Sequence, residues 1–310
     1  MKTDYRILDA HCDTVTELSA CGGELYNNSL HLDAVRMREY GAYLQFFAAW
    51  VDDAAQTPFA DCMACADTFE RELAKNLSIV PVLSARDAQR VFAEGKIGAM
   101  LTVENGYALE AKAENLQTLW ERGVRAMTIT WNGQNELCTG CMAEADTGLT
   151  PFGRDVIAEM NRLGMLVDVS HASENGFWDI VRASRTPVFA SHSNSFSVYA
   201  HPRNLKDEQI RAVAERGGVI GLNLYPAFLS DKQVDLTDCV RHIRHIMNVG
   251  GEDCIGLGSD FDGVEMLPQG IRGAQDYEAL FACLTHSGFT DGQIEKITYQ
   301  NFLRYLAAVL

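Results

Sequence analysis

The sequence predicts a (β/α)8 barrel, on the basis of three observations. Short apolar runs recur eight times along the 310 residues, and they are apolar on both faces, as parallel strands covered by helices must be. Amphipathic stretches alternate with these runs from end to end. The first run leads into Asp9-Ala10-His11-Cys12-Asp13, which lacks the glycine-rich turn usual in a doubly wound sheet, so that fold is the second choice.

The predicted strands are 6–13, 42–51, 98–105, 124–131, 165–171, 187–193, 219–225 and 254–260. The predicted helices are 59–76, 116–122, 153–163, 174–183, 207–216, 236–249 and 276–285, with an extra C-terminal helix over 291–310. Three of them run into Gly123, Gly164 and Gly217, as is typical of helices that end in a left-handed residue. No segment has the composition of a linker, so we expect one domain over 1–310.

Composition excludes several classes of protein. The chain carries 42 acidic and 26 basic residues, a net charge of −16, which argues against binding to a nucleic-acid backbone. It has no run of 18 apolar residues to span a membrane, and its N-terminus has no apolar stretch typical of a signal peptide. Nine cysteines, an odd number, favour reduced thiols. We therefore expect a soluble cytoplasmic protein.

Histidines and carboxylates end five of the predicted strands. Function in such barrels collects at the C-terminal ends of the strands, and His11 and Asp13, two residues apart, point the same way. The other strand-end candidates are Glu104, His171, His192 and Asp260. So many imidazoles and carboxylates in one cavity require a positive charge to offset them, and these donors suit zinc. They are more than one tetrahedral ion needs, so we expect two ions with one bridging carboxylate.

Each of these residues also has a structural interpretation. A single histidine is more often a packed core residue, and Glu104 alone could form an internal ion pair; the combination carries the metal hypothesis. The pairs Cys62/Cys65 and Cys138/Cys141 are too far apart for a zinc ribbon and are expected to be structural. His242 and His245 are expected to lie on a solvated or packed helix face.

With these residues identified, the chain resembles the renal (membrane) dipeptidase family of zinc metallopeptidases, which are barrels of the amidohydrolase type. The resemblance covers nearly the whole chain. It rests on the strand-end motifs above together with Glu104-Asn105-Gly106, Asp168-Val169-Ser170-His171, Ser191-His192-Ser193, His201-Pro202-Arg203-Asn204, Gly258-Ser259-Asp260-Phe261-Asp262-Gly263 and Asn301-Phe302-Leu303-Arg304.

The resemblance implies a role for each matching position. His11 and Asp13 would bind one zinc ion, His171 and His192 the second, and Glu104 would bridge them. Asp260 would be the catalytic acid and base, and Arg203 would bind the substrate carboxylate, a role suited to its planar fork of donors. Tyr225, at the end of the seventh predicted strand, would line the pocket. Two zinc ions would lower the pKa of a shared water and supply a hydroxide.

The fourth predicted strand departs from the family pattern. Trp131 stands where the renal enzyme has a histidine that polarises the scissile carbonyl. An indole donates one hydrogen bond but cannot shuttle a proton, and loss of an oxyanion donor can cost on the order of 10²–10³ in rate. Trp131, Asn132 or a metal would then take over the role, or the substrate range would differ.

Three functions remain open from the sequence. The leading one is a zinc dipeptidase for small dipeptides, including those with a C-terminal D-residue, with a homodimer as a possible assembly. The second is a binuclear amidase acting on N-acyl amino acids or related small amides. The third is a metal- or ligand-binding barrel without turnover, against which the presence of Asp260 counts, because binding alone needs no proton shuttle.

Overall fold

The computed structural model describes residues 3–310. Its strands are β1 (Arg6–Asp9), β2 (Ala42–Trp50), β3 (Ile79–Pro81), β4 (Ile97–Glu104), β5 (Val124–Thr128), β6 (Leu166–Asp168), β7 (Ile220–Leu222) and β8 (Ile255–Leu257). Its helices are α1 (Thr14–Cys21), α2 (Ala34–Met37), α3 (Pro58–Lys75), α4 (Ala85–Glu94), α5 (Ala113–Glu121), α6 (Pro151–Leu163), α7 (Glu174–Ala183), α8 (Asp207–Glu215), α9 (Leu236–Gly250), α10 (Tyr277–His286), α11 (Asp291–Glu295) and α12 (Asn301–Val309).

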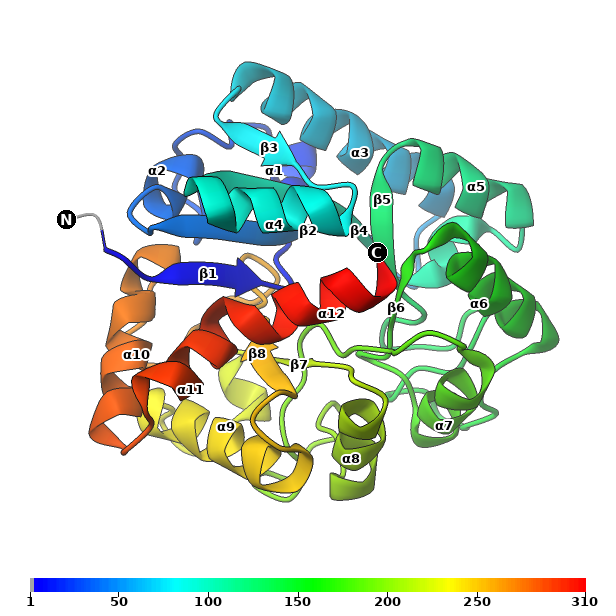
Figure 1. Cartoon of the computed structure of the whole chain (residues 1–310). Coiled ribbons are helices and arrows are strands. Elements are labelled where there is room, and N and C mark those ends of the chain that lie inside the picture. The colour runs from blue at the N-terminus through cyan, green and yellow to red at the C-terminus, as the bar shows by residue number, and fades with distance from the viewer. Residues whose placement is uncertain (1–2) are drawn as a thin grey trace.

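The strands form one curled parallel sheet in the order β6-β5-β4-β2-β1-β8-β7, shown in Figure 1. The predicted strand 187–193 forms only isolated parallel bridges: Phe189 pairs with Asp168 at one edge, and Ala190 pairs with Ile220 at the other. These bridges join β6 to β7 and close the ring. The predicted α/β barrel is therefore confirmed.

Between the first and third predicted strands, the structure contains elements that the sequence pattern did not predict: α1, α2, β3 and α4. Strand β3 is three residues long and pairs with the first residues of β4, Ile97–Ala99. From Leu101 onward, the same edge of β4 pairs with β5. Helix α4 does carry boundary signals, because the Ser84 hydroxyl accepts a hydrogen bond from the Asp87 amide and Gly95 adopts a left-handed conformation. Ser84 and Gly95 therefore mark the two ends of α4 in the sequence itself.

The predicted glycine stops are correct. Gly123, Gly164 and Gly217 have φ values of 91°, 72° and 79°, a region that a residue without a Cβ adopts at little cost. The predicted C-terminal helix 291–310 is also present, as α11 and α12 joined by a π-helical turn over Lys296–Gln300.

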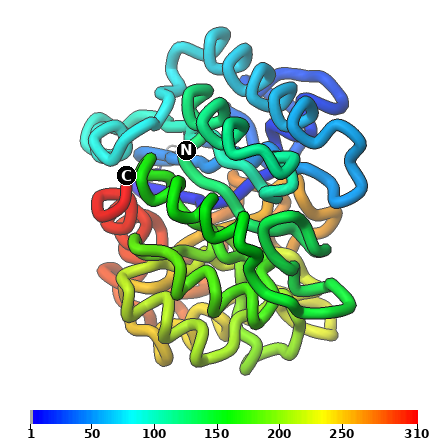
Figure 2. Tube along the Cα trace, turned by 90° about the vertical axis from the view of Figure 1, so that its right-hand side faces the viewer, coloured from blue at the N-terminus to red at the C-terminus, as the bar shows by residue number. Residues whose placement is uncertain are grey.

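Helix α12 closes the N-terminal end of the barrel. The Phe302 ring lies 6.3 Å from that of Phe46 and 6.2 Å from that of Phe189, and the Tyr305 hydroxyl donates to the Pro187 carbonyl. Gly256 leaves room for Phe302, because a Cβ there would lie 2.5 Å from its ring. The helix crosses in front of the strands in Figure 1 and lies at one end of the molecule in Figure 2.

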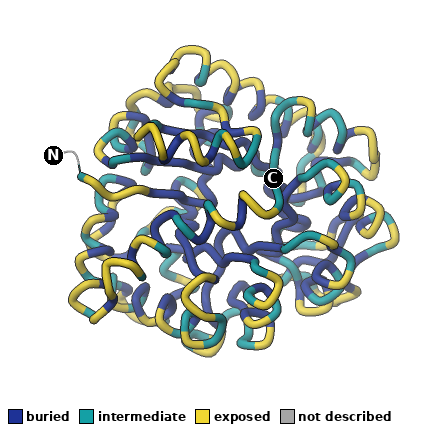
Figure 3. Tube along the Cα trace, viewed as in Figure 1, coloured by how far each residue is buried: buried dark blue, intermediate teal, exposed yellow. Residues whose placement is uncertain are grey.

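Burial follows the layers of the barrel: the strands are buried, and the outer helices carry the exposed residues (Figure 3). One apolar cluster fills the barrel and its α12 end, and a larger one lies between the strands and the surrounding helices. The end opposite α12 is lined with buried polar side chains.

Candidate functional site

The open end of the barrel gathers all six strand-end residues that the sequence predicted. His11 and Asp13 follow β1, and Glu104 is the last residue of β4. His171 follows β6, His192 follows the bridging residue Ala190, and Asp260 follows β8. Each of the six is at most 8% exposed. Parallel strands place their C-terminal ends at one mouth, which is why residues spread over some 250 positions of sequence meet here.

The first group of donors surrounds His11. Its Nε2 lies 3.3 Å from Asp13 Oδ2, 3.4 Å from Glu104 Oε2 and 3.8 Å from Asp260 Oδ1. The second group surrounds the other carboxylate oxygen of Glu104: Oε1 lies 2.9 Å from His171 Nε2 and 3.4 Å from His192 Nε2. Glu104 thus directs one oxygen to each group.

Hydrogen bonds fix the orientation of both histidines in the second group. His171 Nδ1 lies 3.1 Å from Asn132 Oδ1, an acceptor. Ser191 donates its hydroxyl proton to Asp168 Oδ2 at 2.5 Å, so it accepts from His192 Nδ1 at 2.7 Å. With both Nδ1 atoms protonated, both Nε2 atoms present lone pairs, and these face each other at 2.9 Å.

This donor set fits divalent metal ions. Burial lowers the pKa of His171 to about 4 and that of His192 well below its usual value, so both rings are neutral near pH 7, as metal ligands must be. His11 Nε2 and Asp13 Oδ1 are buried and have no hydrogen-bond partner within residues 3–310. The facing lone pairs of His171 and His192, and buried polar atoms without partners, are costly without a cation between them.

The backbone at the mouth adopts unusual conformations to place these groups. Asn105, His171 and Asp260 have positive φ values of 85°, 67° and 64°, which are strained for residues with a Cβ. Gly263 covers the first group so closely that a Cβ would lie 2.3 Å from Asp13 Oδ2 and 2.5 Å from Asp260 Oδ1. Such strain is typical of functional sites.

Asp260 borders a cavity of 380 Å³ that opens above both groups of donors. Asn223 donates from Nδ2 to Asp260 Oδ2 at 2.9 Å, which leaves Oδ1 directed toward His11. The predicted pocket residues Trp131 and Tyr225 line the same cavity.

Arg203 occupies a different position from the other predicted residues. It is 4% exposed and does not line the 380 Å³ cavity; it lines a neighbouring cavity of 250 Å³ that shares His171 with the first. Its guanidinium donates to the His192 carbonyl at 3.0 Å and lies over the Phe228 ring at 5.4 Å. Its buried Nε has no hydrogen-bond partner within residues 3–310.

Comparison with known proteins decides the family. The model of the membrane dipeptidase family, peptidase family M19, matches residues 1–309. The chain belongs to the membrane dipeptidase family. The predicted resemblance is confirmed, and the protein is a metallo-dipeptidase.

Solved structures of related proteins support this assignment. A metallo peptidase from Rhodobacter sphaeroides, liganded with a phosphinate mimic of the dipeptide L-Ala-D-Ala, is 25% identical and has a TM-score of 0.90, with 99% of this chain and 100% of that chain covered. The dipeptidase AC, another metallo peptidase, is 26% identical, with a TM-score of 0.91 and 99% of each chain covered. A protein of the pqqA 5' region of Klebsiella pneumoniae is 36% identical over 239 residues, 73% of this chain and 88% of that protein.

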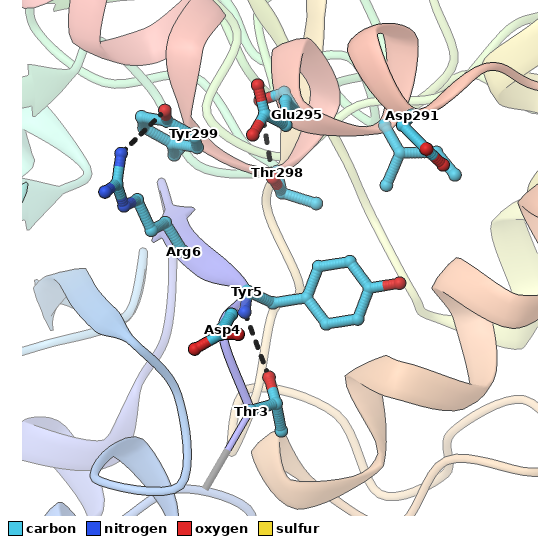
Figure 4. A pocket seen from close by; sticks show the side chains of 9 residues that line it. Thr3, Asp4, Tyr5, Arg6, Asp291, Glu295, Thr298 and Tyr299 are labelled. Carbon is cyan, nitrogen blue, oxygen red and sulfur yellow. Dashed lines mark hydrogen bonds between the residues drawn. The ribbon is translucent and has the colours of Figure 1, made fainter.

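Of the residues in the remaining sequence hypotheses, Cys141 borders the candidate site: its amide donates to the His171 carbonyl at 2.7 Å, and it lines the 250 Å³ cavity together with Arg203. The others lie farther from the two donor groups. Cys62 and Cys65 lie on α3, and His242 is a buried residue that accepts from the Ser195 amide and contacts the Leu229 carbonyl. A separate cavity of 560 Å³ lies beside the start of β1 and is lined by Thr3–Arg6 and residues of α11 and the π-helical turn (Figure 4). It contains none of the strand-end donors. Within residues 3–310, no helix is both long and apolar enough to cross a bilayer.

Several residues of the dipeptidase site had no role assigned from sequence. Asp168, at the end of β6, orients Ser191 and through it His192. Asn223, just after β7, orients Asp260. Both are polar residues at strand ends, so the rule that found the histidines could have found them. Trp50 and Glu17 also line the cavity, and no motif marks them.

The Ser191 hydroxyl is expected to strengthen metal binding through His192. Ser191→Ala removes the acceptor that fixes the ring, and the loss of such an outer hydrogen bond typically weakens metal affinity 10–100-fold. Competition with a zinc chelator measures this change. Ser29→Ala, at an exposed position outside the site, is the control. Unchanged affinity in Ser191→Ala would show that Ser191 does not position the ligand.

Proposed function

We propose that this metallo-dipeptidase uses two zinc ions to hydrolyse small dipeptides, including those with a C-terminal D-residue. The observation that carries the proposal is that the two carboxylate oxygens of Glu104 face different groups of donors. One oxygen faces the group of His11 and Asp13, and the other faces the group of His171 and His192. Imidazole with carboxylate suits zinc. When bound, the two ions would supply Lewis acidity and would lower the pKa of a water at the mouth.

Asp260 is proposed as the general acid and base. Its free Oδ1 faces the first group of donors and the cavity, while Asn223 holds the other oxygen. As the water oxygen attacks the scissile carbonyl carbon, Asp260 accepts the water proton. It then returns that proton to the leaving amine as the C–N bond breaks, so the side chain ends the cycle ionised.

Arg203 is proposed to bind the substrate's C-terminal carboxylate. No carboxylate lies within 4.0 Å of its guanidinium in residues 3–310, although the side chain is buried. A buried charge without a counter-ion favours an anionic ligand. Trp131 and Tyr225 are proposed to line the substrate cavity, and the Trp131 indole N–H is the group available where the family has a histidine.

The chain is further proposed to act as one domain in the cytoplasm and to form a homodimer. All nine cysteines are free thiols, which favours a reducing compartment. The substrate preference is supported by the likeness to the Rhodobacter sphaeroides enzyme with its L-Ala-D-Ala mimic.

Elemental analysis combined with a substrate panel tests the proposal. We expect about two zinc ions per chain, as predicted for a bridged binuclear site, and hydrolysis of both L-Ala-L-Ala and L-Ala-D-Ala. N-Acetyl-alanine is the comparison substrate, because it keeps the amide and the carboxylate but lacks the amine. Faster turnover of N-acetyl-alanine would favour the amidase function, and a protein that takes up no metal would contradict the proposed site.

A further inference from the structure

The catalytic cavity has an acidic wall that the proposed chemistry does not use. Besides Asp13, Glu104 and Asp260, it is lined by Glu17, Asp262 and Glu265, and no lysine or arginine within residues 3–310 lines it. Asp262 has a structural role, because its carboxylate accepts hydrogen bonds from the Thr14 hydroxyl and the His31 amide, each at 2.6 Å. Glu265 is exposed, whereas Glu17 is half-buried and its carboxylate has no hydrogen-bond or ion-pair partner in the described chain.

The backbone holds Glu17 in a defined place above the first group of donors. Its amide donates to the Asp13 carbonyl at 3.0 Å, so Asp13 and Glu17 lie on one face of α1, one turn or about 5.4 Å apart. The hydroxyl of the neighbouring Thr16 donates to the Ala48 carbonyl and accepts from the Trp50 amide, at 2.9 and 3.0 Å. These contacts fix α1 against the end of β2.

Two indole rings line the same cavity as Glu17. Trp50 pairs with Glu104 in the register of β2 and β4, and its ring meets Trp131 edge-to-face at 5.1 Å. Both indoles line the cavity. A cavity lined by an unpaired carboxylate and by indole rings attracts organic cations, through charge and through the negative ring faces.

The order of the strands around the barrel places the Trp50 side of the cavity opposite Arg203. Around the closed ring, the bridging segment that contains Ala190 lies four places from β2 in either direction, and Arg203 contacts the His192 carbonyl of that segment. An extended dipeptide is roughly 7 Å long. With its carboxylate toward Arg203, its N-terminal residue therefore extends toward Glu17 and Trp50.

We propose that Glu17, together with Trp50, selects dipeptides whose N-terminal residue carries a side-chain cation, such as lysine, arginine or ornithine. The inference rests on the proposed dipeptidase geometry. The α-ammonium group is a less suitable partner, because it lies next to the scissile bond and hence at the level of Asp13 and Asp260. Glu17 stands one helical turn along α1 from Asp13, about 5.4 Å away, which is within reach of the end of a long side chain.

Matched substrates test the selection directly. L-Lys-L-Ala and L-norleucyl-L-Ala have side chains of similar length that differ in charge. The wild-type enzyme with its metal is expected to have a kcat/KM about tenfold higher for L-Lys-L-Ala, as one charge-assisted contact would give. Glu17→Gln is expected to remove that advantage and to change the kcat/KM for L-norleucyl-L-Ala less than about twofold.

Two controls separate a local contact from a general effect of charge. Glu215→Gln removes an exposed carboxylate from the end of α8 and is expected to leave the substrate ratio unchanged. L-Glu-L-Ala should be a poor substrate of the wild type and should improve in Glu17→Gln. Equal loss on both matched substrates, or no loss, would overturn the role of Glu17 while hydrolysis of L-norleucyl-L-Ala leaves the dipeptidase function standing. No hydrolysis of any dipeptide would contradict both proposals.

Discussion

Asp260→Asn is expected to lower kcat by about 10³, within the range of 10²–10⁴ typical of general acid–base groups. The amide has nearly the same shape as the carboxylate and can still accept the hydrogen bond from Asn223, which is 2.9 Å from Asp260 Oδ2 in the wild type. It cannot accept a proton from water or return one to the amine. Steady-state hydrolysis of L-Ala-L-Ala measures the loss.

The metal content of Asp260→Asn decides between two roles. The His11, Asp13 and Asp260 side chains are close enough to hold an ion together, so Asp260 could be a ligand instead of a proton shuttle. We expect zinc content equal to that of the wild type. Asp231→Asn, at an exposed position outside the cavity, is the control. Loss of zinc together with activity would assign Asp260 to metal binding.

Glu104→Gln is expected to lower kcat/KM by on the order of 10³ or more and to reduce zinc from about two per chain to one or fewer. Glutamine keeps the side-chain volume but loses the negative charge and one of the two acceptor oxygens, which lie 3.4 Å from His11 and 2.9 Å from His171. One donor group then has no shared carboxylate, and the positive charges at the site are less well compensated. Elemental analysis and steady-state kinetics measure the two effects.

The matched control for this variant is Glu114→Gln, an exposed residue at the start of α5. It should keep wild-type metal content and activity, because it lies outside the site. Full zinc occupancy in Glu104→Gln would contradict the bridging role. Loss of activity with two zinc ions retained would place Glu104 in the chemical step instead.

The polarity pattern of the sequence was sufficient to predict the barrel and the residues that meet at its mouth. Strands β1, β2 and β4 to β8, and the bridging segment 187–193, each coincide with a predicted run that is apolar on both faces. Such strands have no face in contact with water, because helices cover one side and the interior of the barrel is packed on the other. Polar residues at the C-terminal ends of strands could be predicted to meet, because these ends are buried and yet open onto the mouth of the barrel. They are His11, Glu104, His171, His192 and Asp260. Strand β3 escaped prediction because three residues are too few to show a period.

Only the tertiary structure decided which residues distant in sequence contact each other. Asn132 meets His171 across 39 residues, and Asn223 meets Asp260 across 37; a pattern with a period of two or 3.6 residues carries no information at such separations. How strands and loops meet around the ring decides three further features. Glu104 directs one oxygen to each donor group, Arg203 lies in the wall of a second cavity, and Glu17 and Trp50 line one cavity. The sequence by itself determined which residues could reach the mouth, and the closed barrel decided which of them face one another there.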